Sequence, residues 1–293
     1  MKKSTKNRIN VFLFLLPALI LFIGVLIAPL FLSAEYSFFN MKSYGPRTFI
    51  GLQNYKELFT SKSIDFFGAL KNAILLAAFS VFIQLPLSLG LALMLGKGIK
   101  GERVFLSVYF LPVLISTVII GQLFIKIYNP DYGILNVALR SMGFEQLGQL
   151  QWLGKKDLAV GAVFVPTLWQ YVGYHMLLMY AGVKGVSPEL REAAMLDGAT
   201  DGQVNRYIVI PIIKPILKVS VIFAITGSLK AYDLIHVLTD KGASHLVEVP
   251  STLMINMLFT RNRFGMGSAI AVMLIILCFF FALVVNRVFK EED

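Results

Sequence analysis

Long apolar runs dominate this chain of 293 residues, and they constrain its fold more than any other feature. An α-helix needs about 20 apolar residues to cross the hydrocarbon core of a bilayer. Six segments meet this requirement, which indicates an all-α membrane protein because helices satisfy their own backbone hydrogen bonds in lipid. We expect the spans at about residues 11–34, 69–95, 104–128, 157–183, 207–229 and 266–286.

The charge pattern agrees with a membrane protein and argues against nucleic-acid binding. The formal net charge is +10, but only 15% of the residues are charged and 57% are hydrophobic. The lysines and arginines are scattered between the apolar runs and form no basic stripe interleaved with aromatic residues. They are modestly denser in the segments that lie inside if the N-terminus is cytoplasmic, so we expect both termini in the cytoplasm.

The first apolar run could also be a cleaved signal peptide. From Val11 to Ala34 it is longer than the ~7–15 apolar residues of a signal peptide, and Leu32 stands where a cleavage site ending at Ala34 needs a small residue. We therefore expect a retained first span. The predicted organisation is a cytoplasmic tail over residues 1–10, a transmembrane domain over 11–287 and a second cytoplasmic tail over 288–293.

A polar segment, SPELREAAMLDGATDGQVNRYIVIP, lies at residues 187–211 between the fourth and fifth predicted spans. Ser187 followed by Pro188 predicts a helix start, and Gly198 predicts its end. Thr200 and Gln203 have the spacing of a capping box, which predicts a second helix that ends at Pro211.

Two helices of about two turns each are too short to be stable alone in water, so we expect this segment to dock on a partner protein. Ala193 and Ala194 let another backbone approach closely, and Arg191 and Glu192 offer charges for a polar socket. A plain structural loop is the alternative. A DNA-binding helix-turn-helix is disfavoured because spans on both sides leave little freedom to enter a groove.

Polar residues inside a span are costly and often functional. The fourth span contains TLWQYVGYHM, in which Trp169, Gln170, Tyr171 and Tyr174 combine aromatic rings with amide and hydroxyl groups. Such a surface suits a sugar, whose ring has apolar faces and polar edges. The competing interpretation is interhelical packing.

A second candidate for the substrate pathway follows the fifth span. Lys230 and Asp233 are spaced as an i, i+3 ion pair beside Tyr232, and they line the outer mouth of a cavity or anchor the helix end. Further polar residues in the spans are Asn72, Gln84 and Gln122, for which we favour packing.

The chain lacks the sequence patterns of an ATPase or a metal site. In GKGIKGER, Gly96 and Gly101 have the spacing of a phosphate-binding loop, but Glu102 and Arg103 replace its Lys and hydroxyl residue. The three histidines, His175, His236 and His245, are widely separated and have no metal-ligand spacing.

The polar segment resembles the EAA motif of permease subunits of ABC importers. The matching positions are Glu192-Ala193-Ala194, Gly198, Ile208 and Ile210-Pro211, with Ile210 where the family has Leu. Four other stretches resemble the carbohydrate-uptake branch, the maltose and glycerol-phosphate transporter type: FLLPALILFIGVLIAPL, FIGLQNYKELF, AYDLIHVLTDKGA and FGMGSAIAVMLIILCFF.

The resemblance implies a six-helix bundle of the type I ABC importer permease type, with a cytoplasmic coupling helix between spans four and five. That helix docks in a cleft of an ATPase, and its contacts would be Glu192, Ala193, Ala194, Asp197 and Gly198. The implied partners are a second permease subunit, two ATPase subunits that bind ATP and Mg, and an extracytoplasmic binding protein. The binding protein would contact loops 35–67, 129–156 and 235–262.

The resemblance further implies that the chain is not an enzyme, carries no cofactor, and moves a sugar or oligosaccharide across the bacterial cytoplasmic membrane by alternating access. Two other functions fit a polytopic membrane protein. One is a self-sufficient secondary carrier or channel, although the spans contain no carboxylate well inside them for ion coupling. The other is a sensory protein whose cytoplasmic segment contacts a signalling partner.

Overall fold

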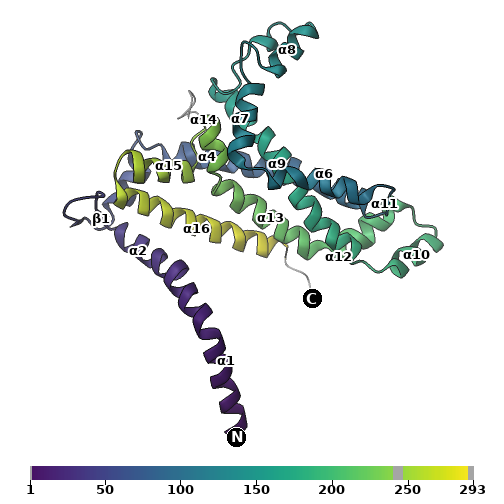
Figure 1. The fold of residues 1–293 in the computed structure, drawn as a ribbon, viewed down its shortest axis with the longest axis horizontal. Helices are drawn as coiled ribbons and strands as arrows, with labels where there is room; N and C mark the ends of the chain where they lie inside the picture. Colours follow the sequence, from purple (N-terminus) through teal and green to yellow (C-terminus); the bar gives the residue numbers. More distant parts are fainter. Residues whose placement is uncertain (1, 240–246, 290–293) are drawn as a thin grey trace. The chain divides into compact units, whose positions relative to one another are not determined.

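The computed structural model describes residues 2–239 and 247–289, which are mostly helical (Figure 1). They divide into two compact units. One comprises the residues up to Asp65 together with Leu253–Ile275, and the other comprises Phe66–Thr252 together with the residues from Ile276 onward.

The first unit contains the N-terminal helices and a short hairpin. Its elements are α1 (Lys2–Leu21), η1 (Phe22–Ile27), α2 (Ala28–Tyr36), β1 (Phe39–Asn40), β2 (Thr48–Phe49), α3 (Gln53–Thr60), η5 (Asn256–Thr260) and the first half of α16 (Phe264–Val288). The division between the two units falls within α15 (Pro250–Ile255). Strands β1 and β2 are antiparallel, with Phe39 opposite Phe49.

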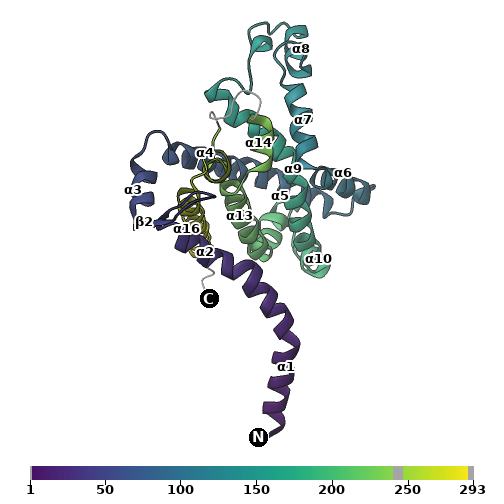
Figure 2. The ribbon, with the colours of Figure 1, turned by 60° about the vertical axis from the view of Figure 1, so that its left-hand side comes forward.

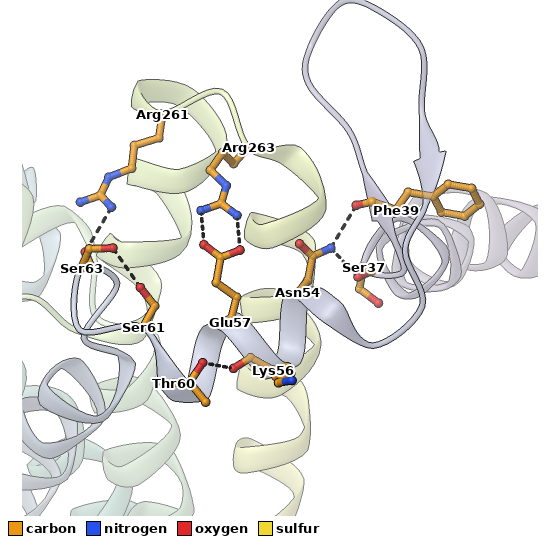
Figure 3. Close-up of polar contacts among 10 residues, drawn as sticks. All are labelled: Ser37, Phe39, Asn54, Lys56, Glu57, Thr60, Ser61, Ser63, Arg261 and Arg263. Atoms are coloured by element: carbon orange, nitrogen blue, oxygen red, sulfur yellow. Dashed lines mark hydrogen bonds and ion pairs between the residues drawn. The ribbon is translucent and has the colours of Figure 1, made fainter.

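The amide of Asn54 fixes the hairpin onto α3. Its Nδ2 donates hydrogen bonds to the carbonyl oxygens of Ser37, at 2.8 Å, and Phe39, at 3.0 Å (Figure 3). The start of α16 packs on the same strand so closely that a Cβ on Gly265 would lie 1.8 Å from the Phe39 carbonyl oxygen. Only glycine therefore fits at position 265, because the obstructing atom belongs to the backbone.

A bidentate ion pair joins α3 to the loop before α16. Arg263 donates from Nη1 to Oε1 of Glu57 at 2.8 Å and from Nη2 to Oε2 at 2.5 Å (Figure 3). Arg261 reaches the carbonyl oxygen of Ser63 at 3.3 Å. The hydrogen bonds from Arg263 lower the pKa of Glu57, partly opposed by desolvation.

Glu57→Gln should reduce the stability of this unit by about 1 kcal/mol or less at pH 7, because the pair is more than one third exposed. A carboxylate with a lowered folded-state pKa stabilises the fold above its unfolded pKa, and that contribution is lost as pH falls through the folded pKa. The difference in thermal midpoint between the two detergent-solubilised proteins should therefore shrink below the ordinary glutamate pKa of 4.5. A pH-independent difference would contradict this origin.

The second unit contains most of the remaining helices. They are α4 (Phe66–Phe79), η2 (Ser80–Gln84), α5 (Leu85–Leu95), α6 (Glu102–Leu114), α7 (Thr117–Ile127), α8 (Ile134–Ser141), η3 (Leu147–Gln149), α9 (Lys156–Lys184), α10 (Pro188–Leu196), α11 (Asp201–Val204), η4 (Asn205–Val209), α12 (Ile210–Ile212), α13 (Lys214–Leu229), α14 (Asp233–Thr239) and the second half of α16. Leu95 and Ala92 of α5, Met176 and Met179 of α9 and Ala224 of α13 form one buried cluster.

Four stretches of the described chain are long and apolar enough to cross a membrane: Val11–Tyr36, Phe66–Leu95, Lys214–Thr239 and Phe264–Val288. The pair α6 and α7 makes a fifth if the two helices count as one bent span. Helix α9 is long enough but less apolar, because it carries Trp169, Gln170, Tyr171 and His175. The count of six spans therefore stays a prediction.

The structure departs from the predicted spans at two places. The third predicted span, 104–128, is broken between α6 and α7, which meet at 92°. Ile115 and Ser116 adopt extended backbone there, just after Pro112, which cannot donate a helical hydrogen bond. The second cytoplasmic helix continues past Pro211 to Ile212, and α13 begins only at Lys214.

Candidate functional site

Helix α10 begins and ends where its sequence predicts. Ser187 occupies the N-cap with non-helical backbone, but its hydroxyl donates a hydrogen bond to the Glu189 carboxylate and does not cap a backbone N–H. This hydrogen bond lowers the pKa of Glu189, with a further contribution from the backbone N–H of Glu189 itself.

A Schellman motif ends α10. Gly198 has φ +88°, the Ala199 N–H donates to the Ala194 carbonyl oxygen at 2.9 Å, and the Gly198 N–H donates to that of Met195 at 3.0 Å. Ala194 and Ala199 both pack on one buried cluster. A Cβ on Gly198 would meet nothing within 4 Å, so the glycine is required for its backbone conformation and not for space.

The predicted capping box of the second helix is confirmed. The Thr200 N–H donates to Oε1 of Gln203 at 2.7 Å, and the Gln203 N–H donates to Oγ1 of Thr200 at 3.4 Å. Lys97, from the loop between α5 and α6, pairs with Asp201 at 2.7 Å in the first turn of this helix. The start of the second helix is therefore fixed both by its own capping box and by an ion pair to the loop between α5 and α6.

The outer surface of α10 is exposed and carries both apolar and acidic side chains. None of its residues is buried, and Leu190, Met195 and Leu196 are 50%, 48% and 89% exposed. In both ribbon views α10 lies at one end of the helices of the second unit, well away from α7 and α8 (Figures 1 and 2). Such a surface suits a docking helix.

The predicted coupling residues divide between two faces of the segment. Glu192, Ala193, Asp197 and Gly198 are exposed. Ala194 instead packs on the chain's own cluster formed by Val183, Val186, Val204, Val209 and Ile213. Arg191 also differs from its expected outward role, because its guanidinium donates a hydrogen bond to the carbonyl oxygen of Val183 at the end of α9.

Gly198→Ala should destabilise the turn by about 1–2 kcal/mol, because a left-handed backbone is strained for a residue with a Cβ. Gly202→Ala is the matched control: a Cβ there also meets nothing within 4 Å, and the position is helical with ordinary backbone. The rate of proteolysis in the 187–211 segment would compare the two variants. Equal behaviour of the two variants would contradict the requirement for positive φ.

A cavity of about 390 Å³ lies in the second unit. Its walls come from α4, η2, α7, α9, α13, α14 and the link between the last two. The polar residues on these walls are Ser80, Gln84, Thr117, Thr167, Tyr171, Tyr174, His175, Thr226, Ser228, Lys230, Tyr232 and Asp233. The volume is in the range of small-molecule binding sites.

Four of the six predicted pathway residues line this cavity: Tyr171, Tyr174, Tyr232 and Asp233. Trp169 lies outside it and packs near Phe124, with ring centroids 6.1 Å apart. Gln170 is also outside the lining: it is 2% exposed, and its Nε2 donates to Oγ1 of Thr117 at 3.3 Å.

The expected ion pair between Lys230 and Asp233 is absent from this part of the described chain, although both residues line the cavity. The i, i+3 argument assumed one continuous helix. Lys230 instead caps the end of α13, and Ala231 and Tyr232 separate it from α14. The ring of Tyr232 stacks on His236, with centroids 5.1 Å apart.

Sequence reasoning missed the hydroxyl groups of the cavity. Thr167, Thr226 and Ser228 donate to carbonyl oxygens one turn back, at 2.7–2.8 Å, which leaves their oxygen lone pairs as acceptors. Single hydroxyl residues in apolar helices give no distinctive pattern. Gln84 also lines the cavity, whereas Asn72 donates from Nδ2 to the Glu248 carbonyl oxygen at 2.9 Å, which is a packing contact.

Apolar helices, a cavity lined by hydroxyl, amide and charged side chains as well as apolar ones, and an exposed, capped helix pair are the features expected of a transport subunit of a membrane. The chain belongs to the family described as binding-protein-dependent transport system inner membrane component, which it matches over residues 84–291. The chain is therefore the permease type of subunit that its EAA motif predicted.

Curated relatives match nearly the full length of the chain. A probable ABC transporter permease protein, YurN of Bacillus subtilis, is 37% identical over 288 residues, which cover 97% of each chain. The diacetylchitobiose uptake system permease protein NgcF of Streptomyces coelicolor is 29% identical and covers 97% of this chain and 83% of its own. The trehalose/maltose transport system permease protein MalF of Thermococcus litoralis is 28% identical, covering 94% and 92%.

A solved structure confirms the fold. A chain of a bacterial ABC transporter that imports the acidic polysaccharide alginate superposes with a TM-score of 0.84 at 23% identity, covering 99% of this chain and 98% of that one. The predicted fold, an all-α permease of the ABC importer type, is therefore confirmed.

Proposed function

We propose that this permease translocates a sugar or oligosaccharide by alternating access, driven by separate ATPase subunits. The observation that carries the proposal is the cavity, in which Tyr171, Tyr174 and Tyr232 converge with Asp233 and Lys230. Relatives named for diacetylchitobiose, trehalose/maltose and xylose/arabinose support the substrate class.

The lining has the chemistry that a sugar needs. Tyrosine rings present apolar faces to the C–H groups of a pyranose, and their hydroxyl groups stay available at the ring edge. Asp233 accepts hydrogen bonds from sugar hydroxyls, and Lys230 donates to them. Side chains from α9, α13 and α14 face the same space, so rearrangement of these helices would change the site and release its occupant.

The partners follow from the proposed role. Glu192, Ala193, Asp197 and Gly198 of the 187–211 segment would dock on an ATPase, whose own residues bind ATP and Mg, with Ala194 supporting the docking helix from behind. A second permease subunit, a second ATPase and an extracytoplasmic binding protein complete the transporter. This chain would carry out no catalysis itself, and both of its termini would lie in the cytoplasm.

Reconstitution tests this function. The permease, purified with its co-purifying ATPases and binding protein, is placed in proteoliposomes, and ATP hydrolysis is measured with a panel of sugars, amino acids and peptides. We expect stimulation by at least one carbohydrate only. Stimulation by amino acids or peptides alone would contradict the substrate class, and a homo-oligomer that purifies without ATPase would favour the self-sufficient carrier.

A further inference from the structure

Arg191 points away from the exposed face of α10 and joins this helix to α9. Its Nη2 donates a hydrogen bond to the carbonyl oxygen of Val183, and its Nε is buried without a hydrogen-bond partner in the described chain. Val183 is fully buried and lies in the last turn of α9. The same carbonyl oxygen accepts a long hydrogen bond from the Val186 N–H, at 3.4 Å. Carbonyl groups in the last turn of a helix carry partial negative charge, which a guanidinium complements.

Few other contacts connect α10 to the rest of the chain. Ala194 packs on the cluster around Val183, but no residue of α10 is buried. The ion pair of this segment, Lys97–Asp201, involves the second helix, and its side chains are 46% and 58% exposed. An exposed pair contributes little. Arg191 therefore provides the main polar attachment of α10.

The helix that Arg191 holds is the one that supplies most of the aromatic cavity wall. Tyr171, Tyr174 and His175 all belong to α9. Val183 lies nine positions after Tyr174 on this helix, a rise of about 14 Å. The end of α9 is tightly packed, since a Cβ on Gly96 would lie 2.4 Å from Cγ1 of Val183. A packed helix of this kind moves as a unit, so a displacement at Val183 reaches the cavity.

We propose that Arg191 is a positioning residue of the transport cycle. Its guanidinium transmits movement of α10 to the carboxyl end of α9, and through α9 to the tyrosines of the cavity. This inference rests on the proposed role of α10 as the ATPase-docking helix. It assigns Arg191 a function distinct from docking, because the side chain faces its own subunit.

The test compares Arg191→Met, which keeps the side-chain bulk but removes the donors, with Arg191→Lys, which keeps a charged donor. Lys97→Met is the matched control, since it removes the exposed attachment of the same segment. Each permease is reconstituted with its ATPases and binding protein. Four quantities are measured: the amount of ATPase that co-purifies, basal ATP hydrolysis, hydrolysis stimulated by the loaded binding protein, and uptake.

We expect Arg191→Met to retain ATPase and basal hydrolysis while uptake falls about tenfold or more, which is in the range of coupling energies between sites. Arg191→Lys should recover part of that loss, and Lys97→Met should stay within about twofold of the wild type, as expected for an exposed pair. Because a structural defect would lower all four quantities together, a selective loss of stimulated hydrolysis and uptake identifies a positioning role.

Wild-type uptake by Arg191→Met would overturn the proposal, and so would loss of ATPase from this variant, since the residue would then act in assembly. If Arg191→Met does not insert, the decision passes to Arg191→Lys. Reduced uptake with retained ATPase and basal hydrolysis would then support the proposal, and loss of ATPase would overturn it. A wild-type chain that retains no ATPase would instead contradict the proposed function itself.

Discussion

Gly173→Ala is expected to abolish uptake and to destabilise the second unit, whereas Gly161→Ala on the same helix is not. A Cβ on Gly173 would lie 1.8 Å from the carbonyl oxygen and 2.5 Å from the carbonyl carbon of Tyr109 on α6. Both obstructing atoms belong to the backbone, so no side-chain rotation relieves the clash. Overpacking costs about 1–3 kcal/mol, and a backbone clash falls at or above the upper end of that range.

The same substitution would also disturb the cavity, because Gly173 lies between Tyr171 and Tyr174 on α9. At Gly161 a Cβ meets nothing within 4 Å, and alanine there gains up to about 1 kcal/mol of helix propensity. The thermal midpoint in detergent and sugar uptake in proteoliposomes measure the two effects. Matching midpoints for the two variants would show that α6 and α9 do not approach each other this closely.

Caps and turns could be predicted from sequence because their interactions are local. The start of α10 at Ser187, its glycine end at Gly198 and the capping box of Thr200 with Gln203 each depend on residues within a few positions of one another. Such contacts form within any chain that has the same short pattern.

The inward orientation of Arg191 and Ala194 could not be predicted in the same way. Which face of a short helix turns inward depends on the cluster that receives it, and here that cluster includes Val183 of α9, Val204 of α11 and Val209 of η4. The pair of Glu57 and Arg263 is separated by 206 positions, and no local signal connects its two residues.

The cavity was predicted only in part for a related reason. Helical spacing places Gln170 and Tyr174 on one face of α9, but the neighbouring α7 supplies Thr117 as a partner that holds Gln170 outside the cavity. The 92° bend between α6 and α7 governs where Thr117 lies. Pro112 indicates that the helix is weakened there, but it does not determine the angle.

Glu192→Lys is expected to abolish both ATPase co-purification and uptake without preventing insertion of the permease. Glu192 is exposed on α10 and makes no hydrogen bond or ion pair with the described part of its own chain, so its carboxylate is available to a cationic group on the docked ATPase. Removing one partner of a buried interfacial charge pair costs about 2–5 kcal/mol or more, and a reversed charge adds like-charge repulsion to that loss. That loss corresponds to a reduction in affinity of about 30-fold to several thousand-fold.

Glu189→Lys is the matched control, because it makes the same charge change one turn earlier on the same exposed helix. The Glu189 carboxylate already accepts a hydrogen bond from Ser187, and a lysine at this helix start costs about 0.3–1 kcal/mol through the helix dipole. We therefore expect its complex with the ATPase to survive. An equal loss of ATPase binding by both variants would show that the added positive charge, and not the loss of Glu192 itself, weakens the complex. Intact ATPase binding by Glu192→Lys would contradict the assignment of Glu192 as a docking residue.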